Sequence, residues 1–462
     1  MAIPDQGFAL ESVVLIVPGV SRSEPVDVEV QGNRITAIRP SSSDVVSGYV
    51  LPGLADAHMH GPLLPFPGEN ALYAFLYLYH GVTATRMAAG DHAIRDAIAG
   101  GMYPGPHIIS CGPFVDGDPP RWRNSLVVST EADARQAVKT IAAQGYDCVK
   151  VYDELTPEAS QHVYEAALIE GLPVIGHVPR RHDATQAWID DQQHLLGLPP
   201  LVAGATKGDP VRAMLRLDQV DSARQSQLAR SMTASGTALT PTLITLQRKI
   251  ALQDTTGLQR SPAARMLPRY YRKQLWHGKE GLVSSRLFSA ADHDQFRVAY
   301  PYAEESIVAL YKAGVELHSG TDSPAEFIVP GAGLLEELQL LQNAGLDAET
   351  VLNISTVASA RYLLGDSHGT LEQGAPANFV VYSQDPTVDL THLASRLAVV
   401  QDGRLYSRQQ LELQLQRYQA WFGRPLYRAA SEAIVGLGLW LINVCLLYTS
   451  DAADDRRGVG GG

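Results

Sequence analysis

The sequence predicts an α/β fold, a (β/α)8 TIM barrel joined to a small β-sandwich that both ends of the chain build. Across most of the 462 residues, eight short β-rich stretches alternate with helical stretches, which is the pattern of such a barrel. Short β-segments separated by Gly-bearing turns instead occupy the start of the chain and return late, in "GTLEQGAPANFVVYS" and "LAVVQDGRLYS". The two ends are therefore expected to share one small domain.

These patterns divide the chain into five parts. They are the first part of the β-sandwich (1–50), the barrel (51–364), the second part of the sandwich (365–412), a C-terminal helical segment (413–444) and a terminal segment of a different character (445–462).

The C-terminal helical segment leads into an uncharged apolar stretch, residues 433–448, which is short of the ~20 residues that span a bilayer. It is either a truncated membrane anchor or an apolar helix packed on the body. The stretch "CLLYTSDAADD" (445–455) matches the translation of a transposon-type sequencing adapter. We therefore expect residues 445–462 to be an artefact that interrupts the natural sequence near Val444.

Composition narrows the compartment and the partners. A formal net charge of −12 and the lack of a basic run argue against nucleic acid or an anionic membrane as the main partner. The chain has three cysteines, so no disulfide framework is expected. The cytoplasm is the expected location unless the C-terminal segment is an anchor, which would add a membrane. A homo-oligomer is possible, but no interface can be identified from the sequence.

The first expected barrel strand ends in two histidines, in "LADAHMHG" (54–61). His58 and His60 are two residues apart, so on a strand both side chains point to the same side and present nitrogen atoms at one level. This spacing suits a metal chelate on a strand.

Other expected strands also end in polar residues. Lys150 interrupts the apolar "VKVYD" of the fourth strand, and His177 ends the fifth in "IGHVP". His194 follows in "QQHLLG" at the sixth, and Asp322 in "SGTDSP" at the eighth. Because the C-terminal ends of barrel strands meet at one mouth, we expect these four residues to converge with the two histidines of the first strand. The convergence predicts a metal site rather than a set of hydrogen-bonded core residues.

These motifs resemble the metal-dependent amidohydrolase superfamily and, within it, the imidazolonepropionase-like and Xaa-Pro dipeptidase-like branch. The matching stretches occur in the family's order over about residues 10–405, and they are "VLPGLADAHMH", "GVTATR", "CVKVY", "GHVP", "QQHLLG", "ALTPTL", "SGTDSP" and "GTLEQGAPANFVVYSQDP". The resemblance implies a hydrolase that cleaves a carbon–nitrogen bond of a small molecule: an amide, a cyclic amide, or an X-Pro or N-acyl bond. Lactone or phosphotriester hydrolysis on the same site is an alternative, as is a non-catalytic barrel scaffold.

The resemblance also implies a binuclear metal centre in which Lys150 is carboxylated by CO2 and bridges two divalent ions. Burial and nearby positive charge favour the neutral amine that this reaction needs. Imidazoles and carboxylates suit Zn2+. The implied ligands are His58, His60, Lys150, His177, His194 and Asp322.

In the mechanism that the resemblance implies, the two ions share a water, lower its pKa and polarise the substrate carbonyl. Asp322 is the general base that takes the proton of this water and passes it to the leaving amine. A purely structural Asp322, capping the turn that follows it, is the alternative.

Four further residues lie beside the expected site. Tyr152 has the parity of Lys150 and either contacts the substrate or lines the barrel. Arg86 ends "TATR" and either contacts an acidic substrate group or supports the rim, whereas His318 lies deeper and is expected to fill the core. Gln193 departs from the family's commonest form, "IEH", because it places a neutral side chain where a carboxylate would orient a ligand.

Overall fold

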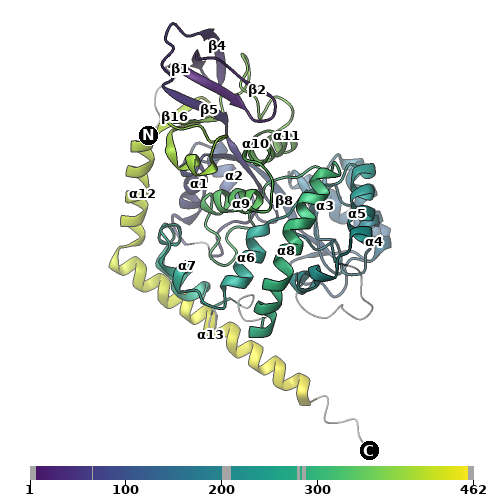
Figure 1. The fold of residues 1–462 in the computed structure, drawn as a ribbon. Coiled ribbons are helices and arrows are strands. Elements are labelled where there is room, and N and C mark those ends of the chain that lie inside the picture. The colour runs from purple at the N-terminus through teal and green to yellow at the C-terminus, as the bar shows by residue number, and fades with distance from the viewer. Residues whose placement is uncertain (1–6, 65, 200–209, 278–280, 283–287, 456–462) are drawn as a thin grey trace, which may run out of the picture.

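The computed structural model describes residues 7–64, 66–199, 210–277, 281–282 and 288–455, with side chains described as far as residue 441. A sheet built from both chain ends lies at one end of a barrel that helices surround (Figure 1). The predicted fold class, a parallel α/β barrel with a small β-sandwich domain, is confirmed.

The sandwich is a mixed sheet with strand order β16-β15-β14-β5-β1-β3-β4, and β2 pairs with β1. β1 and β5 run parallel, whereas β5 and β14 run antiparallel and join the two ends of the chain. Buried Val13, Val30, Phe379 and Val400 belong to its own apolar core. The strands are β1 (Phe8–Val17), β2 (Ser21–Arg22), β3 (Val26–Gln31), β4 (Arg34–Pro40), β5 (Gly48–Pro52), β14 (Phe379–Tyr382), β15 (Arg396–Gln401) and β16 (Arg404–Ser407).

The barrel sheet has strand order β13-β12-β11-β10-β8-β7-β6, with every neighbouring pair parallel, and β9 pairs with β8. Its strands are β6 (Leu54–Met59), β7 (Val82–Met87), β8 (His107–Asp116), β9 (Leu126–Val127), β10 (Cys148–Val151), β11 (Val174–Gly176), β12 (Asp191–Gln193) and β13 (Ala238–Thr240).

The eighth barrel position differs from the prediction. Residues 315–323 were expected to form a strand, but they make only isolated parallel bridges, from Leu317 to Leu239 and from Ser323 to Met59. These bridges still join β13 to β6 and complete the circle. The segment is irregular because Gly320 lies within it and Asp322 has a left-handed φ of 62°, which a regular strand does not allow.

The sixth strand is also shifted from its predicted place. It was expected over 193–197, but β12 covers Asp191–Gln193 and ends before His194. The physical reason is again local, since His194 has a φ of 63° and turns the chain out of the sheet.

Helices surround the barrel on the outside (Figure 1). α4 follows the expected rule, because Pro157 occupies its first turn and Gly171 ends it with a φ of 69°. The α-helices are α1 (Glu69–Tyr79), α2 (Ala93–Ala99), α3 (Glu131–Ala143), α4 (Pro157–Glu170), α5 (Ser222–Ser235), α6 (Leu243–Ala251), α7 (Thr256–Arg260), α8 (Ala290–Lys312), α9 (Ala332–Asn343), α10 (Ala348–Asn353), α11 (Ser359–Leu364), α12 (Arg408–Phe422) and α13 (Pro425–Asp455).

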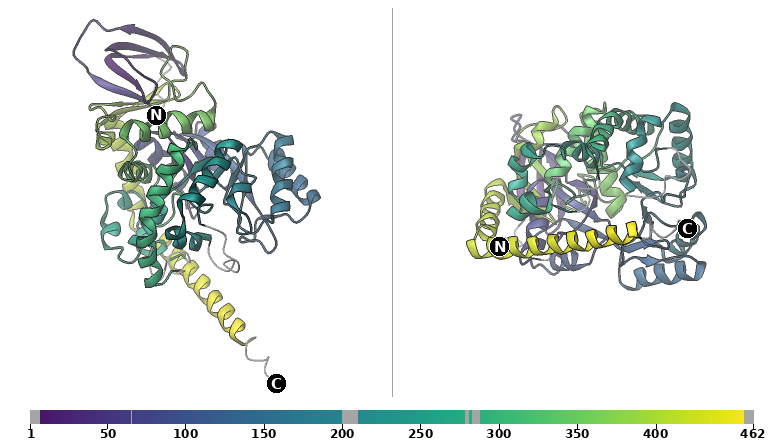
Figure 2. Two further views of the ribbon diagram at one scale, coloured as in Figure 1. Left: turned by 45° about the vertical axis from the view of Figure 1, so that its right-hand side comes forward. Right: turned by 90° about the horizontal axis from the view of Figure 1, so that it is seen from below.

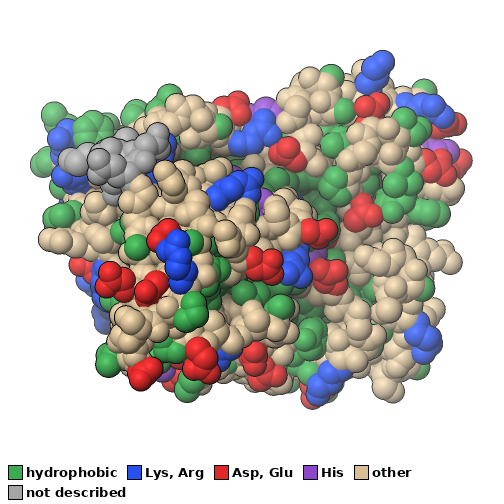
Figure 3. Space-filling view, turned by 90° about the horizontal axis from the view of Figure 1, so that it is seen from above, with side chains coloured by type: hydrophobic (Ala, Val, Ile, Leu, Met, Phe, Trp, Pro, Cys, Tyr) green, Lys and Arg blue, Asp and Glu red, His purple; other side chains and the backbone are tan. Residues whose placement is uncertain are grey.

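The two ends of the barrel have different neighbours. β5 of the sandwich continues almost directly into β6, so the sandwich adjoins the N-terminal ends of the barrel strands. On the face seen from the sandwich side, acidic and basic side chains are interspersed (Figure 3). α13 instead crosses the underside of the molecule (Figure 2). The C-terminal strand ends, where barrel sites lie, therefore face away from the sandwich.

One disulfide joins neighbouring barrel strands. Cys111 on β8 and Cys148 on β10 lie opposite each other, with their Cα atoms 4.5 Å apart. The cysteine count did not predict this bond, because the pairing depends on the register between strands 37 residues apart in sequence.

Helices α12 and α13 make up the C-terminal segment. In the described part of the chain, no helix has both the length and the apolar character needed to cross a membrane. The backbone of α13 continues to Asp455, and the rest of the expected adapter-derived segment lies outside the described residues.

Candidate active site

Three predicted ligands meet at the end of the first barrel strand. The Nε2 atoms of His58 and His60 lie 3.2 Å and 3.1 Å from the same oxygen, Oδ1 of Asp322. Among the described residues, this group is close enough to hold one metal ion. His58 is on β6, His60 directly follows it, and Asp322 lies on the neighbouring segment that closes the barrel. The parity argument for the two histidines and their convergence with Asp322 therefore agree with the geometry.

The remaining two histidines continue this cluster. The ring of His194 lies 4.7 Å from that of His58 and 4.9 Å from that of His177, measured between centroids. Both rings are buried, on the loops that follow β12 and β11. The structure thus brings all four predicted histidines together.

Three of the histidines are oriented by a second protein group at Nδ1. Gln193 Oε1 contacts Nδ1 of His58. Asp153 Oδ1 lies 2.8 Å from Nδ1 of His177, and Thr242 Oγ1 lies 2.6 Å from Nδ1 of His194. With Nδ1 engaged in this way, Nε2 is the nitrogen left for a ligand, as is usual at metal sites. The contact of Gln193 matches the orienting role that the sequence predicts for this position.

Lys150 is buried beside these rings. The side chain is about 1% exposed, and its Nζ has no hydrogen-bond partner among the described residues. Burial lowers the pKa of Lys150 to about 7, although Asp322 opposes the shift. Near neutral pH, Lys150 is therefore a neutral amine in a large fraction of the molecules. The neutral amine is the form that adds CO2.

The electrostatics of the cluster favour cation binding. Burial, followed by the charge of Lys150, lowers the pKa of His58 to about 4 and that of His177 well below its usual value. Burial alone would raise the pKa of Asp322, but hydrogen bonds from His58 and His60 hold it well below its usual range. Neutral imidazoles beside an ionised carboxylate form a donor set that suits Zn2+.

Three residues of the site have strained backbone. His194, Thr242 and Asp322 have φ angles of 63°, 46° and 62°, in the left-handed region that non-glycine residues seldom adopt. For the β-branched Thr242 this conformation is especially costly. Strained residues persist where the surrounding structure holds them, and they cluster at functional sites.

Asp56 links the two walls of the site. Its carboxylate accepts hydrogen bonds from the backbone N–H of His58 at 3.2 Å and from Thr321 Oγ1 at 2.7 Å. It thereby fixes β6 against the closing segment and sets the position of His58 relative to Asp322. Burial raises the pKa of Asp56 to about 7.

A second polar cluster lies deeper in the barrel. Arg86 donates to Asp191 Oδ2 at 2.5 Å and to the carbonyl of Ala57 at 2.8 Å. Asp191 also contacts Nδ1 of His318 at 3.2 Å and accepts from Thr240 Oγ1. Arg86 is about 1% exposed, so its placement favours a supporting role over substrate contact. His318 is fully buried, where the sequence expects a core residue.

Tyr152 lies at the side of the histidine cluster. Its ring is 4.2 Å from that of His177 and 4.6 Å from that of Phe114, centroid to centroid. This position, next to a predicted ligand and only partly buried, keeps Tyr152 a candidate for substrate contact.

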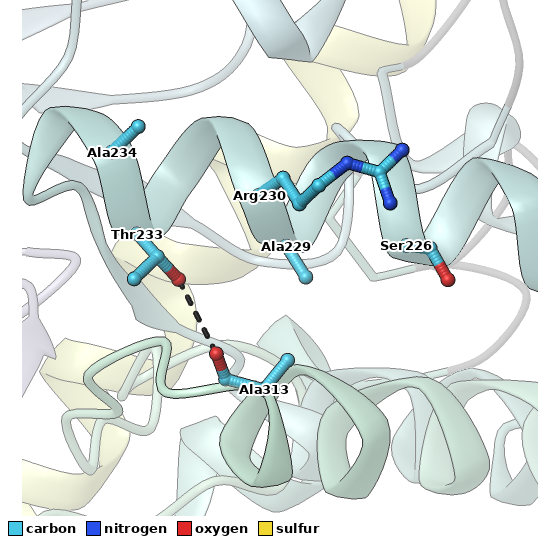
Figure 4. Close-up of a pocket in the computed structure, with 6 residues that line it drawn as sticks. All are labelled: Ser226, Ala229, Arg230, Thr233, Ala234 and Ala313. Atoms are coloured by element: carbon cyan, nitrogen blue, oxygen red, sulfur yellow. Dashed lines mark hydrogen bonds between the residues drawn. The ribbon is translucent and has the colours of Figure 1, made fainter.

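A separate surface pocket lies away from these residues. It has a volume of about 500 Å³ and lies between α5 and the end of α8. Its lining is mostly small side chains, with Arg230 the one charged group and a hydrogen bond from Thr233 to Ala313 (Figure 4). None of the predicted site residues lines it.

Four orienting residues were not identified from the sequence. Asp56 has the parity of His58 on the same strand, so period-two reasoning was sufficient to find it. Asp191 lies two residues before Gln193, and the strand predicted over 193–197 did not include it. Asp153 and Thr242 act from turns after their strands, and their positions depend on loop conformation that a strand pattern does not specify.

The fold and this site define an α/β barrel whose His–His–Asp group could hold a metal ion. A family model described as "Amidohydrolase family" matches residues 49–405, and the chain belongs to this family. The predicted activity class, hydrolysis of carbon–nitrogen bonds, is the class of the family. A search of curated proteins finds no match.

Solved structures with the same fold are similar to this chain. Bottromycin amidohydrolase is 22% identical with a TM-score of 0.72, covering 90% of this chain and 91% of that one. A Xaa-Pro dipeptidase with bound methionine is 19% identical with a TM-score of 0.63, covering 87% of this chain and 100% of the other. An ochratoxinase from A. niger is 15% identical with a TM-score of 0.61, covering 87% and 96%. At these sequence identities, the similarity shows a shared fold alone.

Proposed function

We propose that this protein is a metal-dependent hydrolase that cleaves an amide, cyclic amide, X-Pro or N-acyl bond. The observation that carries the proposal is the orientation of the histidines. Nδ1 of His58, His177 and His194 is engaged by a buried protein group in each case, so Nε2 is the nitrogen that can face a ligand, and Nε2 of His58 lies against Asp322. The orphaned Nζ of Lys150 supports the same site, because a buried amine without a partner is costly unless a ligand completes it.

The residues present fit a binuclear zinc centre with a carboxylated lysine. In this proposal His58, His60, His177, His194 and Asp322 ligate two divalent ions, most favourably Zn2+. The neutral amine of Lys150 could take up CO2 with loss of one proton, and the resulting carbamate would add an anionic oxygen donor to this set. When bound, such ions lower the pKa of a water molecule and polarise the substrate carbonyl.

The chain's own residues perform the proton transfers. Asp322 is held ionised by the histidines that contact it, so it can accept the proton of the attacking water. The same carboxyl group then donates this proton to the leaving nitrogen as the carbon–nitrogen bond breaks. Asp56 and Thr242 hold the two loops at fixed positions, and Tyr152 lies where it can contact the substrate.

The test is a hydrolysis screen under controlled metal loading. X-Pro dipeptides come first, because a structural neighbour is a Xaa-Pro dipeptidase; N-acyl amino acids, cyclic amides, lactones and phosphotriesters complete the panel. We expect hydrolysis of a carbon–nitrogen substrate that a chelator abolishes and Zn2+ restores. Turnover that is unaffected by chelation, or turnover of the phosphotriesters alone, would contradict the proposal.

A further inference from the structure

Helix α13 exposes an apolar face to solvent. It packs on the body through Ser431, Val435 and Leu439, which are buried at four-residue spacing. Residues 433–441 contain no charged side chain, so both sides of the helix are apolar here. A helix that is apolar all round is normally covered. The exposed side chains, 49–58% accessible, are Ile434, Leu437, Trp440 and Leu441.

Basic side chains gather next to this face. The segment 261–277, which includes the short helical turn η4 (Tyr271–Leu275) that contacts α13, carries basic residues and no acidic one. Burial and then the charges of neighbouring arginines lower the pKa of Arg272. The neighbours are Arg269, Arg265 and Arg428.

A single acidic residue lies within the described part of this cluster. Glu432 pairs with Arg269 at 3.0 Å and with Arg428 at 3.4 Å, so one carboxylate is shared by two guanidinium groups. The surface remains positive, although the chain as a whole has a net charge of −12. The local sign is therefore opposite to that of the molecule.

Two tryptophans are exposed here, one within α13 and one at the end of α12. Trp421, at the end of α12, is 40% exposed and has the guanidinium of Arg424 4.4 Å above its ring, and Trp440 is 57% exposed. Tryptophan favours the boundary between hydrocarbon and water, because its ring is large and apolar but carries one polar N–H.

We propose that this α13 surface docks on an anionic lipid bilayer, with the helix lying in the interface. The surface consists of Ile434, Leu437, Trp440 and Leu441 together with Trp421, Arg265, Arg269, Arg272, Arg424 and Arg428. Apolar side chains enter the acyl boundary while arginines bind the headgroup phosphates, which is the combination that holds interfacial helices. Charge complementarity selects an anionic bilayer over a second copy of this acidic chain.

The docked orientation has a consequence for the site. The ring of Tyr427, in the first turn of α13, lies 6.4 Å from that of Phe66, in the loop that follows His60. α13 crosses the underside, opposite the sandwich (Figure 2). Docking therefore brings the barrel mouth towards the bilayer.

The test is flotation of the 462-residue chain with vesicles of phosphatidylcholine, with and without phosphatidylserine. We expect binding to the anionic vesicles, weakened by salt. The pair Leu437→Gln with Trp440→Gln and the pair Arg265→Gln with Arg428→Gln should each lower the affinity about tenfold or more. Matched controls are Leu168→Gln with Ile169→Gln on α4, and Arg135→Gln on α3, all exposed and on helices outside the proposed surface.

The outcomes are distinct. Binding that the α13 variants weaken and the controls retain would support the proposal. No binding to anionic vesicles, or binding that the α13 variants leave intact, would overturn it. Sedimentation without lipid tests the competing occupant: a dimer that Leu437→Gln with Trp440→Gln dissociates would overturn the lipid assignment in favour of a second copy. Circular dichroism of each variant shows whether the fold is retained.

Discussion

Two polar clusters share the interior of this barrel, and they differ in how well they are satisfied. In the deeper one, Asp191 pairs with both Arg86 and His318. Its carboxylate also accepts a hydrogen bond from Thr240. In the upper one, Lys150 has no hydrogen-bond partner among the described residues, and strained backbone holds His194 and Asp322 in place. A cluster whose polar groups are paired within the protein stabilises the fold, and an incomplete, strained cluster is the one that we propose to bind a ligand.

The difference is visible in the carboxylates. Burial alone would raise the pKa of Asp191, but Arg86 and His318 hold it below its usual range. The pKa of Asp322 is also held low, but by His58 and His60, which are proposed metal ligands. The first carboxylate has a dedicated cationic partner, and the second shares its oxygen with groups that a metal would take over.

The largest expected effect comes from the acid–base residue of the upper cluster. Asp322→Asn keeps the shape of the side chain but cannot carry the proton, so kcat should fall by about 10²–10⁴. Steady-state kinetics on the substrate found in the screen measure this. Asp44→Asn, an exposed change in the sandwich, should leave kcat unchanged. A loss of less than about tenfold in Asp322→Asn would assign the proton transfer to another group.

The deeper cluster should affect stability instead. Arg86→Met leaves Asp191 buried without its cation, which should cost about 3–5 kcal/mol of unfolding free energy. Denaturant unfolding measures the loss, with the exposed Arg135→Met as control. Activity per folded molecule should change little. Unchanged stability with a raised KM for acidic substrates would instead give Arg86 the substrate-binding role.

An intermediate effect is expected at the groups that orient the histidines. Asp153→Asn removes the charge that holds Nδ1 of His177, and metal affinity should fall about 10–100-fold. Competition with a chelating dye measures the affinity. Gln193→Glu is the opposite change, because it adds a negative charge next to Nδ1 of His58. It should raise the metal affinity. Equal metal affinities in the wild type and both variants would show that the groups at Nδ1 do not affect metal binding.

The smallest effect concerns Glu337, which accepts the backbone N–H groups of Leu243 and Ile244 at the start of α6. Burial raises its pKa from 4.5 to about 8. The unfolded chain loses this proton at lower pH than the folded protein, so stability falls as the pH rises from 4.5 to about 8. Glu337→Gln should lack this decline and cost about 1–3 kcal/mol at low pH, where the lost acceptor dominates. Parallel pH profiles of unfolding for the two proteins would contradict this.

The predictable part of the site is the part that strand geometry specifies. The spacing of His58 and His60 and the positions of Lys150 and His177 follow from strand ends, and the structure brings them together. His194 and Asp322 were also found, although the strands predicted for them are shorter or irregular. Their left-handed φ angles depend on tertiary contacts that no local pattern encodes.

The residues that orient the site were harder to find for the same reason. Thr242 reaches His194 across 48 residues of sequence, and Asp153 reaches His177 from a turn. Such contacts arise only when the strands are packed side by side. The Cys111–Cys148 bond likewise depends on register, which the sequence of either strand does not specify alone.

The most direct test of the central claim is the metal content of the protein purified without chelator, with Lys150→Ala measured beside it. If Lys150 completes the upper cluster as a bridging carbamate, the wild type should hold about two divalent ions per chain and the variant far fewer. A wild type that holds no metal, even after addition of Zn2+ and bicarbonate, would contradict the account and leave the barrel as a scaffold.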